Sequence, residues 1–230
     1  MLEVISHHFL VFLVGEFPHG PVGGLAMTMI LSLLALAITF PAAVVVAVAR
    51  SHDSALVSSI ATIFVYSVRS IPLLLALFWI YYFLPVLTGV PITAFATVLF
   101  GIVVYQTAYL SEVIRAAIEA LPNGQMEASK ALGMRYFTTM RHIILPQALQ
   151  NAIPGILNQF IIVIKETSLG YIFAFNELTY AASQVNSMEL TKPLQVYFIL
   201  AVVYFAICYS VSRISAGVER GLANRSKAVG

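Results

Sequence analysis

The sequence predicts an all-α, polytopic membrane protein with five transmembrane helices. Hydrophobic residues make up 60% of the 230 residues and charged residues only 10%, whereas a soluble domain carries about 25% charged residues. The mean hydropathy is +0.92. Apolar runs recur along the chain, and about 20 apolar residues in a helix cross the hydrocarbon core of a bilayer. The net charge of +2 gives no indication of a nucleic-acid partner.

The expected spans are separated by polar or proline-containing segments. They cover about residues 23–49, 55–84, 92–110, 149–169 and 194–212. Residues 1–22 contain an apolar run that is too short to span and lacks a preceding positive charge, so we expect an interfacial segment rather than a signal peptide. Residues 111–148 form a polar loop, and residues 213–230 form a basic tail.

Lysine and arginine residues set the expected orientation, because cytoplasmic loops carry an excess of them. An odd number of spans places the two termini on opposite sides. Lys192 alone falls clearly on one side. The other side holds Arg50, Arg115, Lys130, Arg135, Arg141, Arg213, Arg220, Arg225 and Lys227. We therefore expect an outer N-terminus, a cytoplasmic loop 111–148 and a cytoplasmic C-terminus.

The most informative stretch is the polar segment 123–146, NGQMEASKALGMRYFTTMRHIILP. Asn123 follows a proline and is expected to cap a short helix. Gly133 lies where that helix would end, at a position that favours the left-handed conformation of glycine. Pro146 is expected to close a second helical segment. The apolar face of that segment is expected to comprise Phe137, Met140, Ile143 and Ile144.

Within this segment, Glu127-Ala128-Ser129, Gly133 and Ile143-x-Leu145-Pro146 follow a recognisable spacing. The pattern resembles the EAA loop of binding-protein-dependent ABC importer permeases, with Ser129 in place of the second alanine. The alternative is a basic cytoplasmic loop that packs only on its own helix bundle. The resemblance implies a type I ABC importer permease fold in a bacterial inner membrane.

In that family the EAA loop is a coupling helix that sits in a groove of the ATPase subunit. The resemblance therefore implies that small side chains allow close approach, that Glu127 pairs with a basic group or with backbone amides, and that Gly133 permits the turn. The expected coupling residues are Glu127, Ala128, Ser129, Ala131, Gly133, Ile143, Leu145 and Pro146. It also implies two ATPase subunits that bind ATP and magnesium, a second permease chain and a periplasmic solute-binding protein.

The chain itself carries no catalytic signature. No glycine precedes a lysine, so there is no phosphate-binding P-loop. The five histidines lack metal-ligand spacing, and no G-x-S-x-G occurs. We expect a subunit that is not an enzyme and binds no cofactor or metal, with ATP hydrolysed by a partner chain.

Further stretches resemble the polar amino-acid uptake branch of these permeases. They are Ile143–Ala148, Asn158-Gln159-Phe160, Lys165-Glu166-Thr167-Ser168-Leu169 and Arg69-Ser70-Ile71-Pro72-Leu73. The last stretch is similar to that of glutamate/aspartate permeases. Ala76 stands where many relatives carry glutamine, so a polar contact with substrate would be missing. The resemblance implies an amino-acid substrate without deciding which one, or whether this chain binds it.

Two charged spots in apolar surroundings are candidates for the substrate pathway. Arg69 lies about halfway along the second hydrophobic run, where it would either bind carbonyls freed by Pro72, pair with Glu166, or attract a substrate carboxylate. Glu166, Thr167 and Ser168 would line the pathway, or instead form a helix end at which Lys165 reaches toward the interface.

Two other classes of protein fit the composition. An ATP-independent secondary carrier or channel would use Arg69 and Glu166 as an ion site, although the inverted repeats of many carriers are not found. A non-catalytic membrane scaffold leaves the polar fourth span unexplained. The sequence does not decide whether the permease pair is homomeric or heteromeric.

Overall fold

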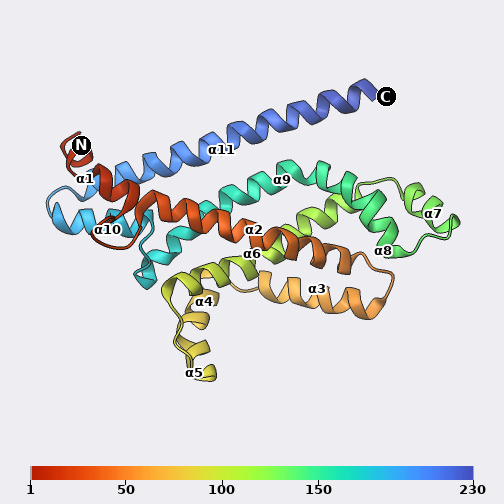
Figure 1. Cartoon of the computed structure of the whole chain (residues 1–230), viewed down its shortest axis with the longest axis horizontal. Helices are drawn as coiled ribbons and strands as arrows, with labels where there is room; N and C mark the ends of the chain where they lie inside the picture. The colour runs from red at the N-terminus through yellow and green to blue at the C-terminus, as the bar shows by residue number, and fades with distance from the viewer. Residues whose placement is uncertain (1, 230) are drawn as a thin grey trace. The chain divides into compact units, whose positions relative to one another are not determined.

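The computed structural model of the chain describes residues 2–229, and every element named within them is a helix (Figure 1). The α-helices are α1 (Leu2–Val14), α2 (Gly24–Arg50), α3 (Ala55–Arg69), α4 (Leu73–Phe78), α5 (Leu84–Thr88), α6 (Ala94–Glu119), α7 (Asn123–Ala131), α8 (Tyr136–Thr139), α9 (Leu145–Glu166), α10 (Leu178–Met188) and α11 (Pro193–Val229). Two π-helical turns, η1 (Trp79–Phe83) and η2 (Met140–Ile144), and one 3₁₀ helix, η3 (Thr167–Phe173), complete the order.

The chain forms two compact units. The first unit comprises residues 1–37, 72–103 and 160–212, and the second comprises residues 38–71, 104–159 and 213–230. The long helices α2, α6, α9 and α11 each have residues in both units.

The core of the first unit is built where α1 packs against α10 (Figure 1). Its buried residues are Val4, Phe12, Leu178, Ala182, Val185, Val196 and Ile199. The backbone N–H of Leu178 donates to the hydroxyl of Thr28 over 3.1 Å and so joins α10 to α2. One face of α1 is therefore buried, while Phe9 and Leu10 on the same helix remain exposed.

The core of the second unit joins α2, α6 and the segment from η2 into α9. Its buried residues are Ala43, Ala47, Leu110, Ile114, Ile118, Met140, Ile144 and Ala148. Alanine on α2 and α9 lets the larger aliphatic side chains of α6 fill the space between helices. Met140 and Ile144 belong to the polar segment 123–146, and Met126 of the same segment packs against this core.

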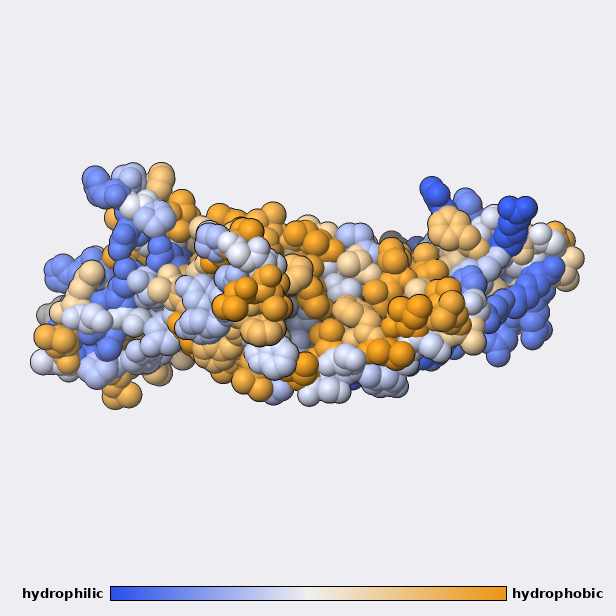
Figure 2. Space-filling view, turned by 90° about the horizontal axis from the view of Figure 1, so that it is seen from below, coloured by the Kyte–Doolittle hydropathy of each residue, from blue (hydrophilic) through white to orange (hydrophobic). Residues whose placement is uncertain are grey.

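The apolar helices agree with a membrane protein. Within the described residues 2–229, four are long and apolar enough to cross a bilayer: Gly24–Arg50, Ala94–Glu119, Tyr136–Phe173 and Pro193–Gly221. The second span, expected to be interrupted at residues 69–72, is a broken pair, α3 and α4–α5, which brings the number to five if the pair is one span. Many large apolar side chains are exposed, Val86 and Leu194 among them. Figure 2 shows how much of one face they cover.

Proline positions explain the breaks. The gap between α3 and α4 coincides with Pro72, which disfavours helical conformation in the residue before it. The π-turns η1 and η2 each end two residues before a proline, Pro85 and Pro146 respectively. Proline lacks the N–H that the helical hydrogen-bond ladder needs, although Pro41 and Pro154 lie inside continuous α-helices.

One expectation about segment ends is wrong. Pro146 does not close the second helical segment, because η2 leads directly into α9 and a single helical stretch runs from Tyr136 to Phe173. The basic residues after position 212 continue α11 as helix up to Val229.

Candidate functional site

Helix α7 (Asn123–Ala131) occupies the place expected for the coupling helix. Its N-cap is Pro122, so the prediction that Asn123 caps the helix is wrong by one residue. At the other end Gly133 has φ +74°, which confirms the predicted left-handed glycine. Gly133 N–H donates to the carbonyl of Lys130 and Met134 N–H to that of Ser129, each over 3.0 Å. These two bonds form a Schellman motif and satisfy the last carbonyls of the helix.

The residues of the motif divide between two faces of α7. Glu127, Ala128 and Ala131 are exposed, and the Glu127 carboxylate has no partner within the described part of the chain. Ser129 is only 2% exposed, and its hydroxyl donates to the carbonyl of Gln125 over 2.8 Å. The expectation that Ser129 lies on the docking side is therefore wrong, because its side chain points into the chain's own core.

The last part of the motif holds α7 in place. Gln125 on α7 and Gln147 on α9 exchange two amide hydrogen bonds of 2.9 and 2.8 Å. Gln147 also donates to the carbonyl of Ile143 over 2.7 Å. Ile143 and Leu145 pack against the core of the second unit, whereas Pro146 is exposed. Ile143 and Leu145 therefore belong to the core below α7 and not to its exposed face, and no contact of Pro146 with α7 is found among the described residues.

The apolar face expected after Gly133 is formed only in part. Met140 and Ile144 are 1% and 3% exposed, and Ile143 packs beside them. Phe137 was assigned to the same face, but 67% of it is exposed. Four-residue helix α8 leads straight into a π-turn, which changes the angular spacing between Phe137 and the residues after it.

Arg69 lies in a cluster of charges around Glu112 in the second unit. Its guanidinium is 3.9 Å from the Glu112 carboxylate and 5.0 Å from the centre of the Tyr109 ring. Arg50 and Arg115 also pair with Glu112. Sequence reasoning paired Arg69 with freed carbonyls or with Glu166, and it missed Glu112 as a shared partner. Helices α2, α3 and α6 meet at this carboxylate.

Glu166, Thr167 and Ser168 lie in the first unit, where α9 ends and η3 begins. Thr167 is fully buried, and its hydroxyl donates to the carbonyl of Ile164 over 2.7 Å. The Ser168 hydroxyl donates to the carbonyl of Lys165 over 2.6 Å. Thr167 therefore presents no exposed group to a pathway, which contradicts its assignment there. Glu166 is partly buried.

Two buried polar residues, Gln106 and Glu177, were not singled out from the sequence. Gln159 donates an amide hydrogen bond to the side-chain oxygen of Gln106, and both are at least 94% buried in the second unit. Gln106 is the only amide side chain in the run 92–110, which is the signal that would have drawn attention to it. A paired amide inside an apolar bundle fixes two helices against each other.

Glu177 is the second such group and the N-cap of α10. Its carboxylate accepts from the backbone N–H groups of Thr179 and Tyr180, each over 2.8 Å, and from the Tyr204 hydroxyl over 3.2 Å. It is completely buried. Burial raises the pKa of Glu177 from its ordinary 4.5 to about 7, against the opposing effect of these donors. The sequence offers only a weak signal for it, an acidic residue before a helix.

Residues 39–224 match the family described as "Binding-protein-dependent transport system inner membrane component". This match covers far more than half of the chain, including α7 and its support. The chain belongs to this family. The family resemblance inferred from the motif spacing is thereby confirmed.

Relatives and solved structures point to the amino-acid branch of these permease proteins. The chain is 34% identical over 86% of its length to the inner membrane amino-acid ABC transporter permease protein YhdY of Escherichia coli, of which it spans only 55%. It is 33% identical over 87% of its length to the L-cystine transport system permease protein TcyB of Bacillus subtilis, of which it spans 85%.

The crystal structure of an amino acid ABC transporter with histidines superposes with a TM-score of 0.81 at 29% identity, covering 95% of this chain and 97% of the other. The fold is therefore that of an ABC importer permease, as predicted.

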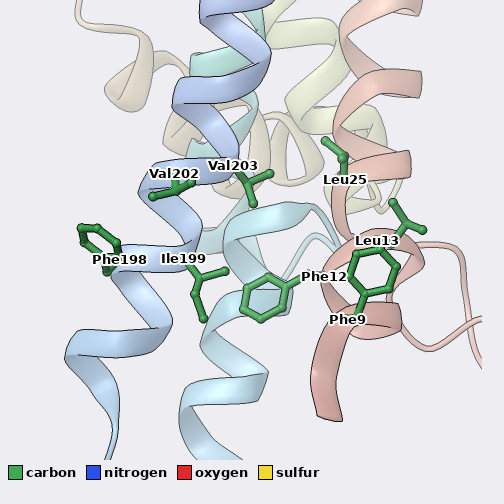
Figure 3. Close-up of a pocket in the computed structure, with 8 residues that line it drawn as sticks. All are labelled: Phe9, Phe12, Leu13, Leu25, Phe198, Ile199, Val202 and Val203. Carbon is green, nitrogen blue, oxygen red and sulfur yellow. The ribbon is translucent and has the colours of Figure 1, made fainter. Parts of the chain in front are cut away.

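A wholly apolar pocket of about 210 Å³ lies in the first unit between α1, α2 and α11 (Figure 3). Phe9, Phe12 and Leu13 come from α1, Leu25 from α2, and Phe198 with three further residues from α11. Because no polar group points into it, this pocket cannot recognise the ammonium and carboxylate groups of an amino acid. Among the described residues, no three His, Cys, Asp or Glu side chains lie close enough together to hold a metal ion.

Proposed function

We propose that the chain is the permease subunit of an ATP-driven ABC importer for polar amino acids, and that α7 transmits movement from a separate ATPase subunit. The observation that carries the proposal is the exposed face of α7. Glu127, Ala128 and Ala131 form a small, charged surface on a helix whose end is fixed by Gly133. In this scheme the chain itself hydrolyses nothing.

A helix that transmits movement must be rigidly attached to the helices that it moves. Helix α7 is attached on one side by the paired amides of Gln125 and Gln147 and on another by the Lys130–Asp53 ion pair of 3.1 Å. The buried side of α7, which includes Ser129, packs against the rest of the unit. A displacement of α7 would therefore be transmitted to α9 through Gln147. Binding of ATP would shift such an element between two states.

The exposed Glu127 carboxylate is suited to a partner of opposite charge. It would pair with a basic group or with backbone amides of an ATPase subunit, while Ala128 and Ala131 would allow the two surfaces to approach closely. The remaining motif residues Ser129, Gly133, Ile143, Leu145 and Pro146 would shape and support this surface rather than contact the partner.

The distribution of basic residues supports an orientation with α7 and the C-terminus in the cytoplasm and the N-terminus outside. Arg50, Arg115 and Lys130 all lie in the second unit with α7. Such an excess of arginine and lysine is typical of cytoplasmic loops. A periplasmic solute-binding protein would then deliver substrate from the other side of a bacterial inner membrane.

The substrate assignment rests on the polar residues and on the relatives' names. Arg69 would attract a substrate carboxylate, and Glu166, with Ser168 beside it, would separately line the pathway. The similarity of residues 69–73 to glutamate/aspartate permeases favours an acidic substrate, whereas TcyB is named for L-cystine. Arg69 already contacts Glu112, so a substrate carboxylate would have to share or replace that partner.

Purification from native membranes in mild detergent tests the proposal. We expect an ABC ATPase to accompany the chain, with either a second copy or a similar permease. Glu127→Lys should release the ATPase, because it reverses the charge of an exposed side chain without disturbing the core. Retention of the ATPase by Glu127→Lys and by Gly133→Val would contradict docking on α7. A folded chain without any ATPase would favour an ATP-independent carrier.

A pair of glycines offers a matched control for the turn. A Cβ on either Gly124 or Gly133 meets no atom within 4 Å, but only Gly133 has a positive φ. Valine at Gly133 must adopt a conformation that β-branched residues avoid. We therefore expect Gly133→Val to abolish substrate-stimulated ATPase activity and Gly124→Val to leave it nearly unchanged. Nearly full substrate-stimulated ATPase activity in both variants would show that coupling does not need the turn at Gly133.

A further inference from the structure

An amphipathic groove of about 590 Å³ lies in the second unit, between the end of α2 and the segment α8–η2. One side is apolar and includes Val44, Val45, Val48, Met140 and Leu145. The other side carries His52, Arg135, Tyr136 and Arg141. The groove is therefore chemically unlike the wholly apolar pocket of the first unit.

Hydrogen bonds fix the walls of this groove. The Tyr136 hydroxyl donates to the carbonyl of Val48 over 2.9 Å, and Val48 is among the last residues of α2, whose carbonyls lack partners within the helix. The His52 ring packs edge-on against Tyr136 with 4.6 Å between ring centres. The N–H of Ser54 donates to His52 Nδ1 over 2.9 Å. The groove is thus held open by contacts within the chain.

The two arginines of the groove differ from the other basic residues around them. In the second unit Arg50, Arg115 and Lys130 each pair with a carboxylate. Arg135 and Arg141 are exposed, and neither has an acidic partner within the described part of the chain. Two positive charges therefore flank the groove without an anion to neutralise them.

The apolar side of the groove also leaves large hydrophobic side chains exposed. Val45 is 68% exposed and Phe137, at the edge of the groove, is 67% exposed. Val45 belongs to Gly24–Arg50, a helix long and apolar enough to cross a membrane. The fitting ligand is therefore an amphipathic anion that brings its own apolar chain.

We propose that this groove binds an anionic phospholipid. Its phosphate lies beside Arg135 and Arg141, and an acyl chain lies along the exposed side chains of Val45 and Phe137. Basic pockets between membrane helices bind anionic head groups in this way. A protein partner fits less well, because the exposed motif residues Glu127 and Ala128 of α7 do not line the groove. The inference does not depend on docking of an ATPase.

Quenching of a tryptophan by brominated lipids tests the proposal in the full chain reconstituted into vesicles. Trp79 is the only tryptophan, so Trp79→Phe combined with Phe137→Trp places a single reporter at the groove. Vesicles contain phosphatidylcholine with either brominated phosphatidylglycerol or brominated phosphatidylcholine. We expect stronger quenching by the anionic lipid, and a preference that weakens in high salt.

Substitutions assign the preference to the two arginines. Each basic residue near a membrane surface strengthens binding of an anionic lipid about fivefold. Arg135→Gln and Arg141→Gln should each lower the preference by about that factor, whereas lysine at both positions should retain it. Arg213→Gln is the matched control, because Arg213 is exposed in the same unit but does not line the groove.

Three outcomes overturn the proposal. The first is equal quenching by the two lipids. The second is a preference for the anionic lipid that is unchanged in the glutamine variants. If those variants do not fold, a preference that is unchanged in high salt has the same meaning. The third is a reporter shielded from both lipids when the chain is isolated together with its partner proteins, because the groove would then be a protein interface.

Discussion

Glu112 and Glu177 are two glutamates that this protein stabilises in different ways. Glu112, in the second unit, is surrounded by Arg50, Arg69 and Arg115. Glu177, in the first unit, contacts no cation among the interactions described for it and is held by two backbone N–H groups and the Tyr204 hydroxyl. Glu112 is 28% exposed at its side chain, whereas Glu177 is completely buried.

The comparison teaches that the partners, and not the residue type, decide the charge state. Guanidinium groups of Arg50, Arg69 and Arg115 lie around Glu112 and let it join α2, α3 and α6. Neutral donors satisfy the oxygens of Glu177 without supplying a positive charge, so burial dominates and raises its pKa to about 7. Glu112 is paired with guanidinium groups, whereas Glu177 is poised to change its charge near neutral pH.

Removal of Glu112 should have the largest effect on stability. Glu112→Ala leaves Arg50 without its carboxylate, although the Arg50 side chain is only 6% exposed. We expect a loss of about 3 kcal/mol in the free energy of unfolding in detergent, at the lower end for a broken buried pair because Glu112 itself is partly exposed.

Glu119→Ala is the matched control for Glu112→Ala. Glu119 also pairs with Arg115, but its side chain is 59% exposed. Its loss should cost no more than about 0.5 kcal/mol. Equal losses in the free energy of unfolding would show that the cluster around Glu112 contributes no more to stability than an exposed ion pair.

Glu177 should make stability depend on pH. Its pKa is raised from 4.5 to about 7 by folding, so the folded state holds the proton more tightly than the unfolded state. The resulting stabilisation is fully present below pH 4.5 and is lost as the pH rises through about 7. The change is at most about 3 kcal/mol. Thermal unfolding of wild type and Glu177→Gln across this range measures it, and a wild-type profile parallel to that of the variant would refute it.

Tyr204→Phe should have a smaller effect that itself changes with pH. The hydroxyl donates to Glu177, and a hydrogen bond to an ionised group is worth about 1.5–3 kcal/mol against about 1 kcal/mol for a neutral pair. We therefore expect Tyr204→Phe to destabilise more at pH 8 than at pH 5. Tyr209→Phe, on an exposed position of the same helix, serves as the control. An equal loss of stability at both pH values would show that Glu177 does not change its charge between pH 5 and pH 8.

The Lys130–Asp53 pair should contribute least. Both side chains are more than half exposed, at 54% and 68%. Exposed ion pairs are worth about 0–1 kcal/mol. Asp53→Asn should therefore change the free energy of unfolding by no more than about 0.5 kcal/mol, and the change should vanish in high salt. A salt-independent loss above 1 kcal/mol would show that this pair supports α7 more strongly than its exposure indicates.

The sequence by itself determined the features that depend on a few neighbouring residues. Pro72 predicted the break between α3 and α4, and Gly133 predicted the end of α7, because φ and hydrogen-bonding capacity are properties of single residues. The apolar runs predicted the all-helical fold, and the spacing of the motif predicted the family.

Only the tertiary structure decided which polar groups meet. Arg50 and Glu112 are 62 residues apart in sequence, and Gln106 and Gln159 are 53 apart. Ser129 turned inward although its small neighbours are exposed, because one side of a short helix must pack on the core beneath it. Local patterns fix the conformation of a segment, but the packing of distant helices selects its partners, and partners decide charge and burial.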